Sequence, residues 1–153
     1  MGVEPSAAMA EKARECGLTV HPGVAEKLPF ADGMFDYILM VTTICFVDDV
    51  LISFREARRV LKPGGYLIVG LVDKESELGK QYEQIRNTNK FYRDATFFSS
   101  AEVIDYLRQA GFTSIRSKQT LIPGEAVSLV TDGYGTGSFV AIRGQKPAQQ
   151  ARP

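Results

Sequence analysis

The sequence predicts an α/β domain built on a mostly parallel sheet, and three observations support this fold class. Strand-like and helix-like segments alternate along the 153 residues, as expected for strand–helix–strand units. Two nearly continuous apolar runs, residues 35–41 and 66–72, are typical of strands buried on both faces in a parallel sheet. The last two strand candidates have no helix between them, so they predict an antiparallel hairpin at one edge of the sheet.

The amino-terminal part predicts one helix between short strands, followed by a loop and a long strand. Ser6 is a suitable N-cap for this helix, and Gly17 supplies the left-handed conformation that ends it. The dipeptide Asp32-Gly33 predicts a turn at the end of the loop. The expected elements are a strand end at residues 3–6, the helix at 7–16, a strand at 18–21, the loop at 23–33 and the strand at 35–41.

A second helix is expected after Asp48 or Asp49, either of which can cap it. Its apolar residues recur at helical spacing: Val50, Phe54, Ala57 and Leu61. The segment Pro63-Gly64-Gly65 is expected to end this helix and to lead into the strand at residues 66–72.

The carboxy-terminal half predicts two helices and the two final strands. Ser99 and Glu102 form a capping box for the second of these helices, and Gly111 ends it. The expected elements are a helix at residues 75–87, an aromatic-rich segment at 90–98, a helix up to residue 110, and strands at 115–121 and 139–143. We expect a single, partial domain over residues 1–146 and a disordered tail at 147–153.

Composition excludes several classes of function. Lys plus Arg and Asp plus Glu each number 18, so the net charge is zero, which gives no electrostatic basis for binding nucleic acid or a membrane surface. Cys16, Cys45 and His21 are too few and too scattered for a zinc site. Because no apolar run reaches the roughly 20 residues of a membrane span and no signal peptide opens the chain, we expect a cytoplasmic protein.

Two segments carry a specific family resemblance. The first is Glu26-Lys27-Leu28-Pro29-Phe30 with Phe35-Asp36 after it, and the second is Arg59-Val60-Leu61-Lys62-Pro63-Gly64-Gly65. With both segments in this order and spacing, the chain resembles the class I S-adenosylmethionine-dependent methyltransferases, in particular the small-molecule type 11 group. The resemblance implies a Rossmann-like three-layer sandwich, the cofactor S-adenosylmethionine and a small-molecule methyl acceptor. Turn chemistry alone also explains both segments as folding features.

The resemblance implies cofactor-binding positions at the ends of successive strands, where ligands of open α/β sheets bind. Glu4, followed by Pro5, ends the first strand and is expected to hold the ribose hydroxyls. In the family, the loop after the next strand packs against the adenine through Asp-Ala-Glu. The matching residues here are Val24, Ala25 and Glu26. Because valine replaces the Asp, its contact with the adenine is either missing or made by Glu26. Thr42 and Thr43, after the following strand, are expected to meet the methionine part. The alternatives are a surface carboxylate for Glu4 and ordinary loop capping for the others.

No catalytic residue can be singled out, because methyl transfer depends mainly on positioning and needs a base only for some acceptors. The titratable candidates lie on segments expected to cap the site: Glu77, Tyr82, Tyr92, Asp94 and Tyr134. The aromatic residues between 91 and 98 either line an apolar acceptor pocket or pack a helix onto the sheet. The glycine-rich segment at residues 132–137 precedes a strand and opens no helix, so we interpret it as a hairpin connection rather than a nucleotide loop.

The chain departs from the family pattern at its amino-terminal end. The family's first strand, its glycine-rich loop and the helix after it are expected before Val3 and are absent, so we expect a truncated domain. That strand is central in the fold, and without it residues 37–41 form an exposed apolar edge through which chains can pair. Three hypotheses remain open: part of a methyltransferase, a split or intertwined protein such as a homo-oligomer joined at this edge, and a non-catalytic remnant that acts as a binding module.

Overall fold

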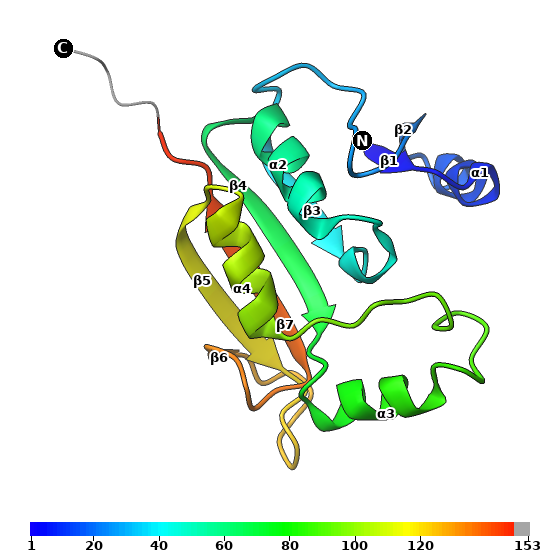
Figure 1. Ribbon diagram of the computed structural model, residues 1–153, viewed down its shortest axis with the longest axis vertical. Helices are drawn as coiled ribbons and strands as arrows, with labels where there is room; N and C mark the ends of the chain where they lie inside the picture. Colours follow the sequence, from blue (N-terminus) through cyan, green and yellow to red (C-terminus); the bar gives the residue numbers. More distant parts are fainter. Residues whose placement is uncertain (149–153) are drawn as a thin grey trace.

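The computed structural model describes residues 1–148 and contains two sheets (Figure 1). The larger sheet has the strand order β3-β4-β7-β5-β6, and β1 and β2 form a separate two-stranded sheet. The strands are β1 Gly2–Glu4, β2 Val20–Pro22, β3 Phe35–Val41, β4 Leu61–Val72, β5 Thr113–Thr120, β6 Thr131–Asp132 and β7 Phe139–Gln145.

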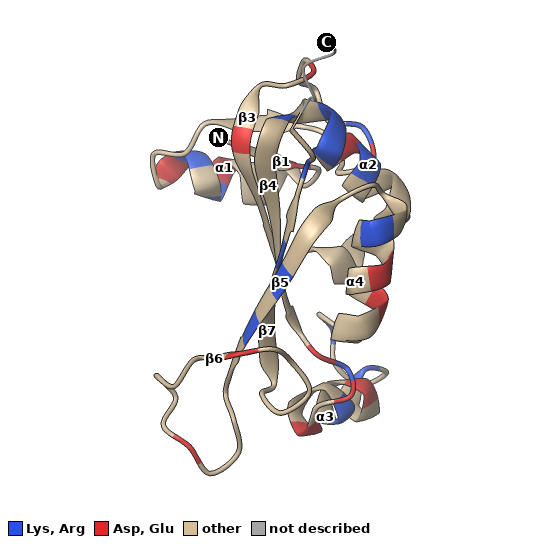
Figure 2. Cartoon of the chain, turned by 90° about the vertical axis from the view of Figure 1, so that its left-hand side faces the viewer, with Lys and Arg blue, Asp and Glu red and all other residues tan. Residues whose placement is uncertain are grey.

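Helices cover one face of the larger sheet. In Figure 2, α2 and α4 lie along one side of the strands, whereas α1 lies on the other side with the two-stranded sheet. The helices are α1 Ala7–Glu15, α2 Val50–Val60, α3 Glu77–Ile85 and α4 Ser100–Gln109, with a short 3-10 helix η1 at Ile44–Phe46. This arrangement confirms the α/β class that the sequence predicts. None of the helices within residues 1–148 is long and apolar enough to cross a membrane.

The larger sheet is mixed. β3 and β4 pair in parallel, and helix α2 supplies the crossover that a parallel connection needs. β4 pairs with β7, β7 with β5, and β5 with β6, all in antiparallel orientation. The predicted antiparallel pair is thus confirmed, but β7 lies inside the sheet between β4 and β5, and the short β6 forms the edge.

The hydrophobic core lies between the larger sheet and the helices α2 and α4. Phe54 of α2, Leu67 and Val69 of β4, Leu107 of α4 and Ile142 of β7 are fully buried. Fully burying a side chain of this size contributes about 1.5–3 kcal/mol. This core therefore fixes the ends of β3 and β4 in relation to the helices.

The helix caps confirm the local predictions. The side chain of Ser6 accepts from the amide of Met9, and Asp49 accepts from the amide of Ile52. The capping box of Ser99 and Glu102 is complete. These signals depend only on neighbouring residues, which explains why the sequence predicts them well.

The boundary between α2 and β4 differs from the prediction. The helix ends at Val60, and Leu61 is already extended, so β4 begins five residues before the predicted strand. The segment Pro63-Gly64-Gly65 lies inside the strand, where the pairing with β3 is irregular. A side chain at position 65 would meet the carbonyl oxygen of Asp36 at 2.9 Å, so glycine is required by close packing of the two strands.

Strand β3 lies at the edge of the larger sheet and pairs only with β4 among residues 1–148. Tyr37 is 66% exposed and Leu39 is 67% exposed, whereas Met40, on the other face, is buried. The expectation that this strand is buried on both faces is therefore wrong for the described residues. The expectation of an exposed apolar edge at residues 37–41 is confirmed.

The end of β7 is firmly anchored. The amide of Lys146 donates to the carbonyl of Gly65 at 2.8 Å, and the amide of Gly64 donates to the carbonyl of Lys146 at 2.9 Å. The predicted tail begins directly after this anchor, and residues 149–153 of it lie outside the described residues.

Candidate functional site

Glu4 and Pro5 lie at the carboxyl end of β1. β1 and β2 pair in parallel with Glu4 opposite Pro22, so the ends of both strands lie side by side. The carboxylate of Glu4 is half-buried, and its Oε1 accepts from the amide of Ser6 at 2.9 Å. This bond fixes the carboxylate at the strand end, where its remaining lone pairs can accept from hydroxyl groups of a ligand.

The loop after β2 forms a tight turn. The carbonyl of Val24 accepts from the amide of Lys27 at 3.2 Å, and the side chain of Val24 is 44% exposed. Ala25 packs against the hydrophobic core. The turn thus presents one exposed apolar side chain next to the strand end that carries Glu4.

Glu26 anchors this turn to helix α2. Its Oε1 accepts from the amides of Asp48 at 2.7 Å and Asp49 at 3.1 Å, directly before the helix begins. A carboxylate is favourable at this position because of the partial positive charge of a helix amino terminus. Sequence reasoning missed this role, since the partners lie more than 20 residues away.

Thr42 directly follows β3 and has a strained conformation. Its φ is +50°, in the left-handed region that β-branched residues rarely adopt. Its amide donates to the carbonyl of Gly70, and the hydroxyls of Thr42 and Thr43 both donate to the carbonyl of Val41. Strain of this kind persists only where surrounding bonds enforce it, and it is frequent at ligand-binding sites.

The structure groups the predicted residues into two sets. Val24, Ala25 and Glu26 follow the strand that pairs with the strand of Glu4, whereas the two threonines end β3 in the larger sheet. Glu26 connects the two sets, because it caps the helix that follows the threonines and η1. Within residues 1–148, no backbone pairing joins the two sheets.

The two family segments are joined by Arg59. Its guanidinium donates to the carbonyls of Phe30 at 2.8 Å and Leu28 at 3.1 Å, and it forms ion pairs with Asp32 and Glu56. Glu56 in turn accepts from the amide of Leu28 at 3.0 Å. The hydrogen bond from Arg59 lowers the pKa of Glu56 below its usual range. These contacts support the structural interpretation of the segments, since they hold the loop before β3 against α2.

A cavity of about 350 Å³ opens at the carboxyl ends of β3 and β4. This volume lies within the range of small-molecule sites. Ile44, Leu71 and Val72 contribute apolar surface from η1 and β4, and Thr42 lies at its border. The aromatic residues Tyr82, Tyr92 and Phe97 line it from α3 and the segment after it.

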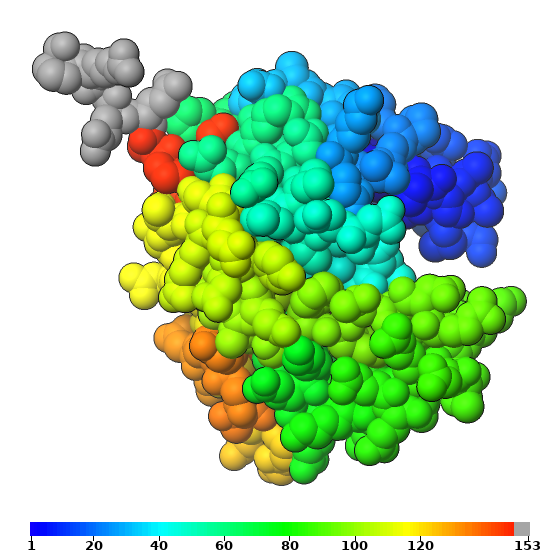
Figure 3. Space-filling model, viewed as in Figure 1, coloured from blue at the N-terminus to red at the C-terminus, as the bar shows by residue number. Residues whose placement is uncertain are grey.

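The segment after α3 is hydrogen-bonded at both sides of the cavity, on one side to η1 and on the other to the residues that follow β4. The amide of Thr96 donates to the carbonyl of Cys45 at 2.8 Å, and the amide of Lys74 donates to the carbonyl of Phe98 at 3.1 Å. Figure 3 shows this light-green segment in contact with the cyan segment that follows β3. The aromatic wall is therefore held in place, although Phe91 at its outer end is exposed.

Two titratable groups that line the cavity, Cys45 and Tyr92, have raised pKa values. Burial raises the pKa of the Cys45 thiol. Burial raises the pKa of Tyr92, and so does the neighbouring hydroxyl of Tyr82 in the role of hydrogen-bond acceptor. Both groups therefore stay protonated at neutral pH, and the thiol of Cys45 already donates to the carbonyl of Thr42 at 3.4 Å.

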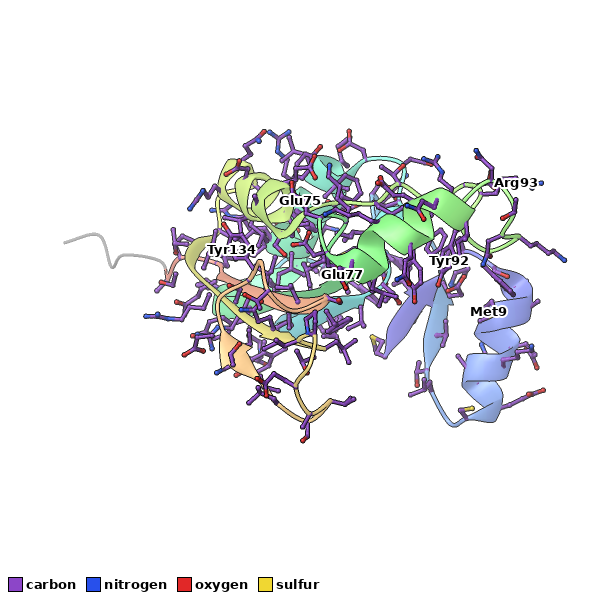
Figure 4. All side chains as sticks on the ribbon, turned by 90° about the horizontal axis from the view of Figure 1, so that it is seen from below. Met9, Glu75, Glu77, Tyr92, Arg93 and Tyr134 are labelled. Carbon is purple, nitrogen blue, oxygen red and sulfur yellow. The ribbon has the colours of Figure 1, made fainter. Side chains whose placement is uncertain are left out.

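The other sequence candidates lie elsewhere. Glu77 and Asp94 are exposed and do not line the cavity, whereas Tyr134 borders a second, smaller hollow beside Asp73. Figure 4 shows Tyr92 and Met9 on one side of the molecule and Tyr134 on the other. Among residues 1–148, no cluster of three or more His, Cys, Asp or Glu side chains could hold a metal ion.

The glycine-rich segment at residues 132–137 lies in the connection between the paired strands β5 and β7, as the hairpin interpretation predicts, but this connection also contains the short strand β6. The side chain of Gln119 accepts from the amides of Thr136 at 2.9 Å and Gly137 at 2.7 Å. A side chain at position 137 would collide with the carbonyl oxygen of Thr120. These amides are therefore used within the hairpin rather than offered to a nucleotide.

Comparisons with known proteins point to one family. A family model described as a methyltransferase domain matches residues 1–69. The chain resembles the structure of a SAM-dependent methyltransferase from Thermotoga maritima, described as a possible histamine N-methyltransferase, with a TM-score of 0.91 and 51% identity. The match covers 95% of this chain and 72% of that one.

Two curated relatives are similar over most of this chain. An uncharacterized protein of Methanocaldococcus jannaschii is 42% identical over 95% of this chain and 73% of its own length. The malonyl-[acyl-carrier protein] O-methyltransferase of Geobacter sulfurreducens is 32% identical over 89% of this chain, which spans 57% of that protein.

Proposed function

Because the chain belongs to the class I, type 11 family of S-adenosylmethionine-dependent methyltransferases, we propose that it directs a methyl group to a small-molecule acceptor. The bound cofactor supplies a methyl group on a sulfonium, and the lone pair of an acceptor atom takes it while the bonding pair stays on sulfur. The protein's main task is therefore to hold acceptor and donor in line. Any proton lost by the acceptor passes to water.

The residues at the strand ends fit this cofactor. The fixed carboxylate of Glu4 can accept from the ribose hydroxyls, with Pro5 shaping the turn beside it. The exposed apolar Val24 offers a surface to a planar base, and the amide of Ala25 offers a donor. Because Glu26 already caps α2, we assign it to positioning this turn rather than to a base contact. Thr42 and Thr43 are assigned to the methionine part.

Thr42 is the observation that carries the proposal. It combines a strained left-handed backbone at the end of β3 with a place at the border of the 350 Å³ cavity. A cofactor that reaches Thr42 would therefore end next to a space of the right size for a small acceptor. The description of the Thermotoga relative makes histamine, an imidazole ring that carries an alkylamine, the first acceptor to assay.

Calorimetric titration of the full chain with S-adenosylhomocysteine tests the cofactor part. We expect measurable binding that Glu4→Gln weakens about tenfold or more, because hydrogen bonds to a charged group contribute about 1.5–3 kcal/mol. Glu11→Gln, at a carboxylate on the exposed surface of α1, is the matched control and should bind like the wild type. No binding by the wild type would contradict the proposal and would favour a non-catalytic binding module.

A further inference from the structure

Asp73 is a buried residue that directly follows β4, with only 4% of its surface exposed. Its Oδ1 accepts from the amide of Glu75 at 2.9 Å, and its Oδ2 accepts from the amide of Ser100 at 3.0 Å. Among residues 1–148, Asp73 forms no ion pair with a basic side chain. Ser100 is the first residue of α4, and the partial positive charge of that helix end stabilises the buried carboxylate. Asp73 thus joins the two ends of the segment between β4 and α4.

Lys74 adds two contacts at the same place. Its amide donates to the carbonyl of Phe98 at 3.1 Å, and its ammonium group forms an ion pair with Glu102 of α4 at 2.7 Å. We call these contacts of Asp73 and Lys74 the base clasp. The base clasp closes residues 74–99 into a loop.

The closed loop carries the aromatic wall of the cavity. Tyr82 and Tyr92 are stacked, with ring centroids 4.8 Å apart. The outer residues 83–88 are exposed, so they contribute little to holding the loop in place. The position of the wall therefore depends on the attachments of the loop at its base and at η1. Apart from Phe46, the aromatic residues that line the cavity all belong to this loop: Tyr82, Phe91, Tyr92, Phe97 and Phe98.

On its other side the loop reaches Thr42. The amide of Thr96 donates to the carbonyl of Cys45 at 2.8 Å, and the thiol of Cys45 donates to the carbonyl of Thr42 at 3.4 Å. Thr96 lies close in the chain to Phe98, which the base clasp holds. A displacement of the base clasp is therefore passed along the backbone to the residues around Thr42.

We propose, on the basis of the methyltransferase function above, that Asp73 is a positioning residue for methyl transfer. Its carboxylate fastens the base clasp, and the fastened loop holds the aromatic wall and η1 in a fixed relation to Thr42. Asp73 does not itself line the cavity, so it acts through the loop. Loss of either hydrogen bond to Asp73 leaves a buried amide without an acceptor, which favours local opening of the loop.

Alkylation of Cys45 by iodoacetamide, followed by mass spectrometry, measures this opening on the full chain. Cys45 is half-buried and Cys16 is exposed, and Cys16→Ser leaves Cys45 as the only thiol. In this background Asp73→Asn should speed the alkylation about tenfold, because the asparagine nitrogen cannot accept from an amide. Urea denaturation of the same samples gives the global free energy of unfolding, which separates opening of the loop from unfolding of the chain.

A second variant removes the contact from the opposite partner. Ser100→Pro deletes the amide that donates to Asp73, and proline is favourable at the first position of a helix, so this variant should also speed alkylation about tenfold. Asp105→Asn, at an exposed carboxylate of α4, is the matched control and should react like the parent. Arg59→Lys, which alters contacts between α2 and the loop before β3, controls for lost stability. It should speed alkylation no more than its global unfolding explains.

Near-ultraviolet circular dichroism gives a second readout, which a general loss of stability does not change while the chain stays folded. Because the chain contains no Trp, the stacked rings of Tyr82 and Tyr92 contribute to this signal. The signal should weaken in both base-clasp variants and stay unchanged in Asp105→Asn. Alkylation at the parent rate in both folded base-clasp variants would overturn the inference, as would an acceleration no greater than global unfolding explains.

These measurements need neither cofactor nor acceptor, so they are independent of the titration with S-adenosylhomocysteine. Faster alkylation in a chain that binds no S-adenosylhomocysteine would support the base clasp and overturn the proposed methyl transfer. Binding of S-adenosylhomocysteine together with unchanged alkylation would overturn only the role of Asp73.

Discussion

Arg59 and Asp32 lie 2.7 Å apart, and this ion pair joins the last turn of α2 to the turn that leads into β3. The same guanidinium donates to the carbonyls of Leu28 and Phe30. A planar group with five donors can satisfy several acceptors at once, which lysine cannot do. Arg59 thus makes several of the contacts that hold the loop after residues 24–26 against α2.

Arg59→Lys should therefore lower the free energy of unfolding by about 2 kcal/mol, since it leaves several acceptors without donors. Urea denaturation monitored by circular dichroism measures the change. Arg55→Lys, at an exposed position of the same helix, is the control and should change stability little. Equal stability of the two variants would show that the contacts of Arg59 contribute nothing to folding.

Stability should also depend on pH through Glu56. Its pKa is lowered chiefly by the hydrogen bond from Arg59, so its contribution is fully present above the usual glutamate pKa of about 4.3. The contribution is lost as the pH falls through the lowered pKa of the folded state. We expect Glu56→Gln to flatten the fall in unfolding free energy in this acidic range, whereas Glu83→Gln, on the exposed surface of α3, keeps the wild-type slope. A Glu56→Gln slope equal to that of the wild type would contradict the coupling.

The left-handed backbone of Thr42 gives a third prediction. Thr42→Gly and Thr42→Ala both remove the hydroxyl, but only glycine adopts a φ of +50° without strain. The glycine variant should be about 1 kcal/mol more stable than the alanine variant, as measured by urea denaturation. If alanine is the more stable of the two, Thr42 is not strained in solution.

The exposed face of β3 predicts self-association. Leu39 and Tyr37 are both about two-thirds exposed on an edge strand, and such edges pair with other chains. Light scattering after gel filtration should show a mass that rises with protein concentration, and Leu39→Glu should shift the protein toward the monomer. Leu18→Glu, at an exposed leucine outside this strand, should leave the distribution unchanged. A wild-type monomer at all concentrations would exclude pairing through this edge.

Features that depend on neighbouring residues could be predicted from the sequence, whereas features that depend on contacts between distant residues could not. The caps at Ser6, Asp49 and Ser99 could be read because donor and acceptor are three residues apart. The exposure of β3 could not, since an apolar run has the same appearance whether or not a second layer covers it. The early start of β4 at Leu61 likewise depends on its pairing with Phe35, which no local pattern records.

In the candidate site, too, some features could be predicted from the sequence and others depend on distant contacts. The strand ends that carry Glu4, residues 24–26 and Thr42 follow from the order of elements, because ligand positions in α/β sheets depend on topology. The cap formed by Glu26 and the strain of Thr42 depend on partners in other elements. For the aromatic residues between 91 and 98, both alternatives apply. Tyr92 and Phe97 line the cavity, whereas Phe98 packs edge-on against Tyr106 of helix α4.

The cap formed by Glu26 couples the turn at residues 24–26 to the start of α2, so that motion of one affects the other. One carboxylate oxygen holds the amides of Asp48 and Asp49, so a ligand that steadies the turn also slows the opening of those two hydrogen bonds. Hydrogen–deuterium exchange at these two amides should therefore slow when a ligand binds at the turn, and this can be measured without turnover.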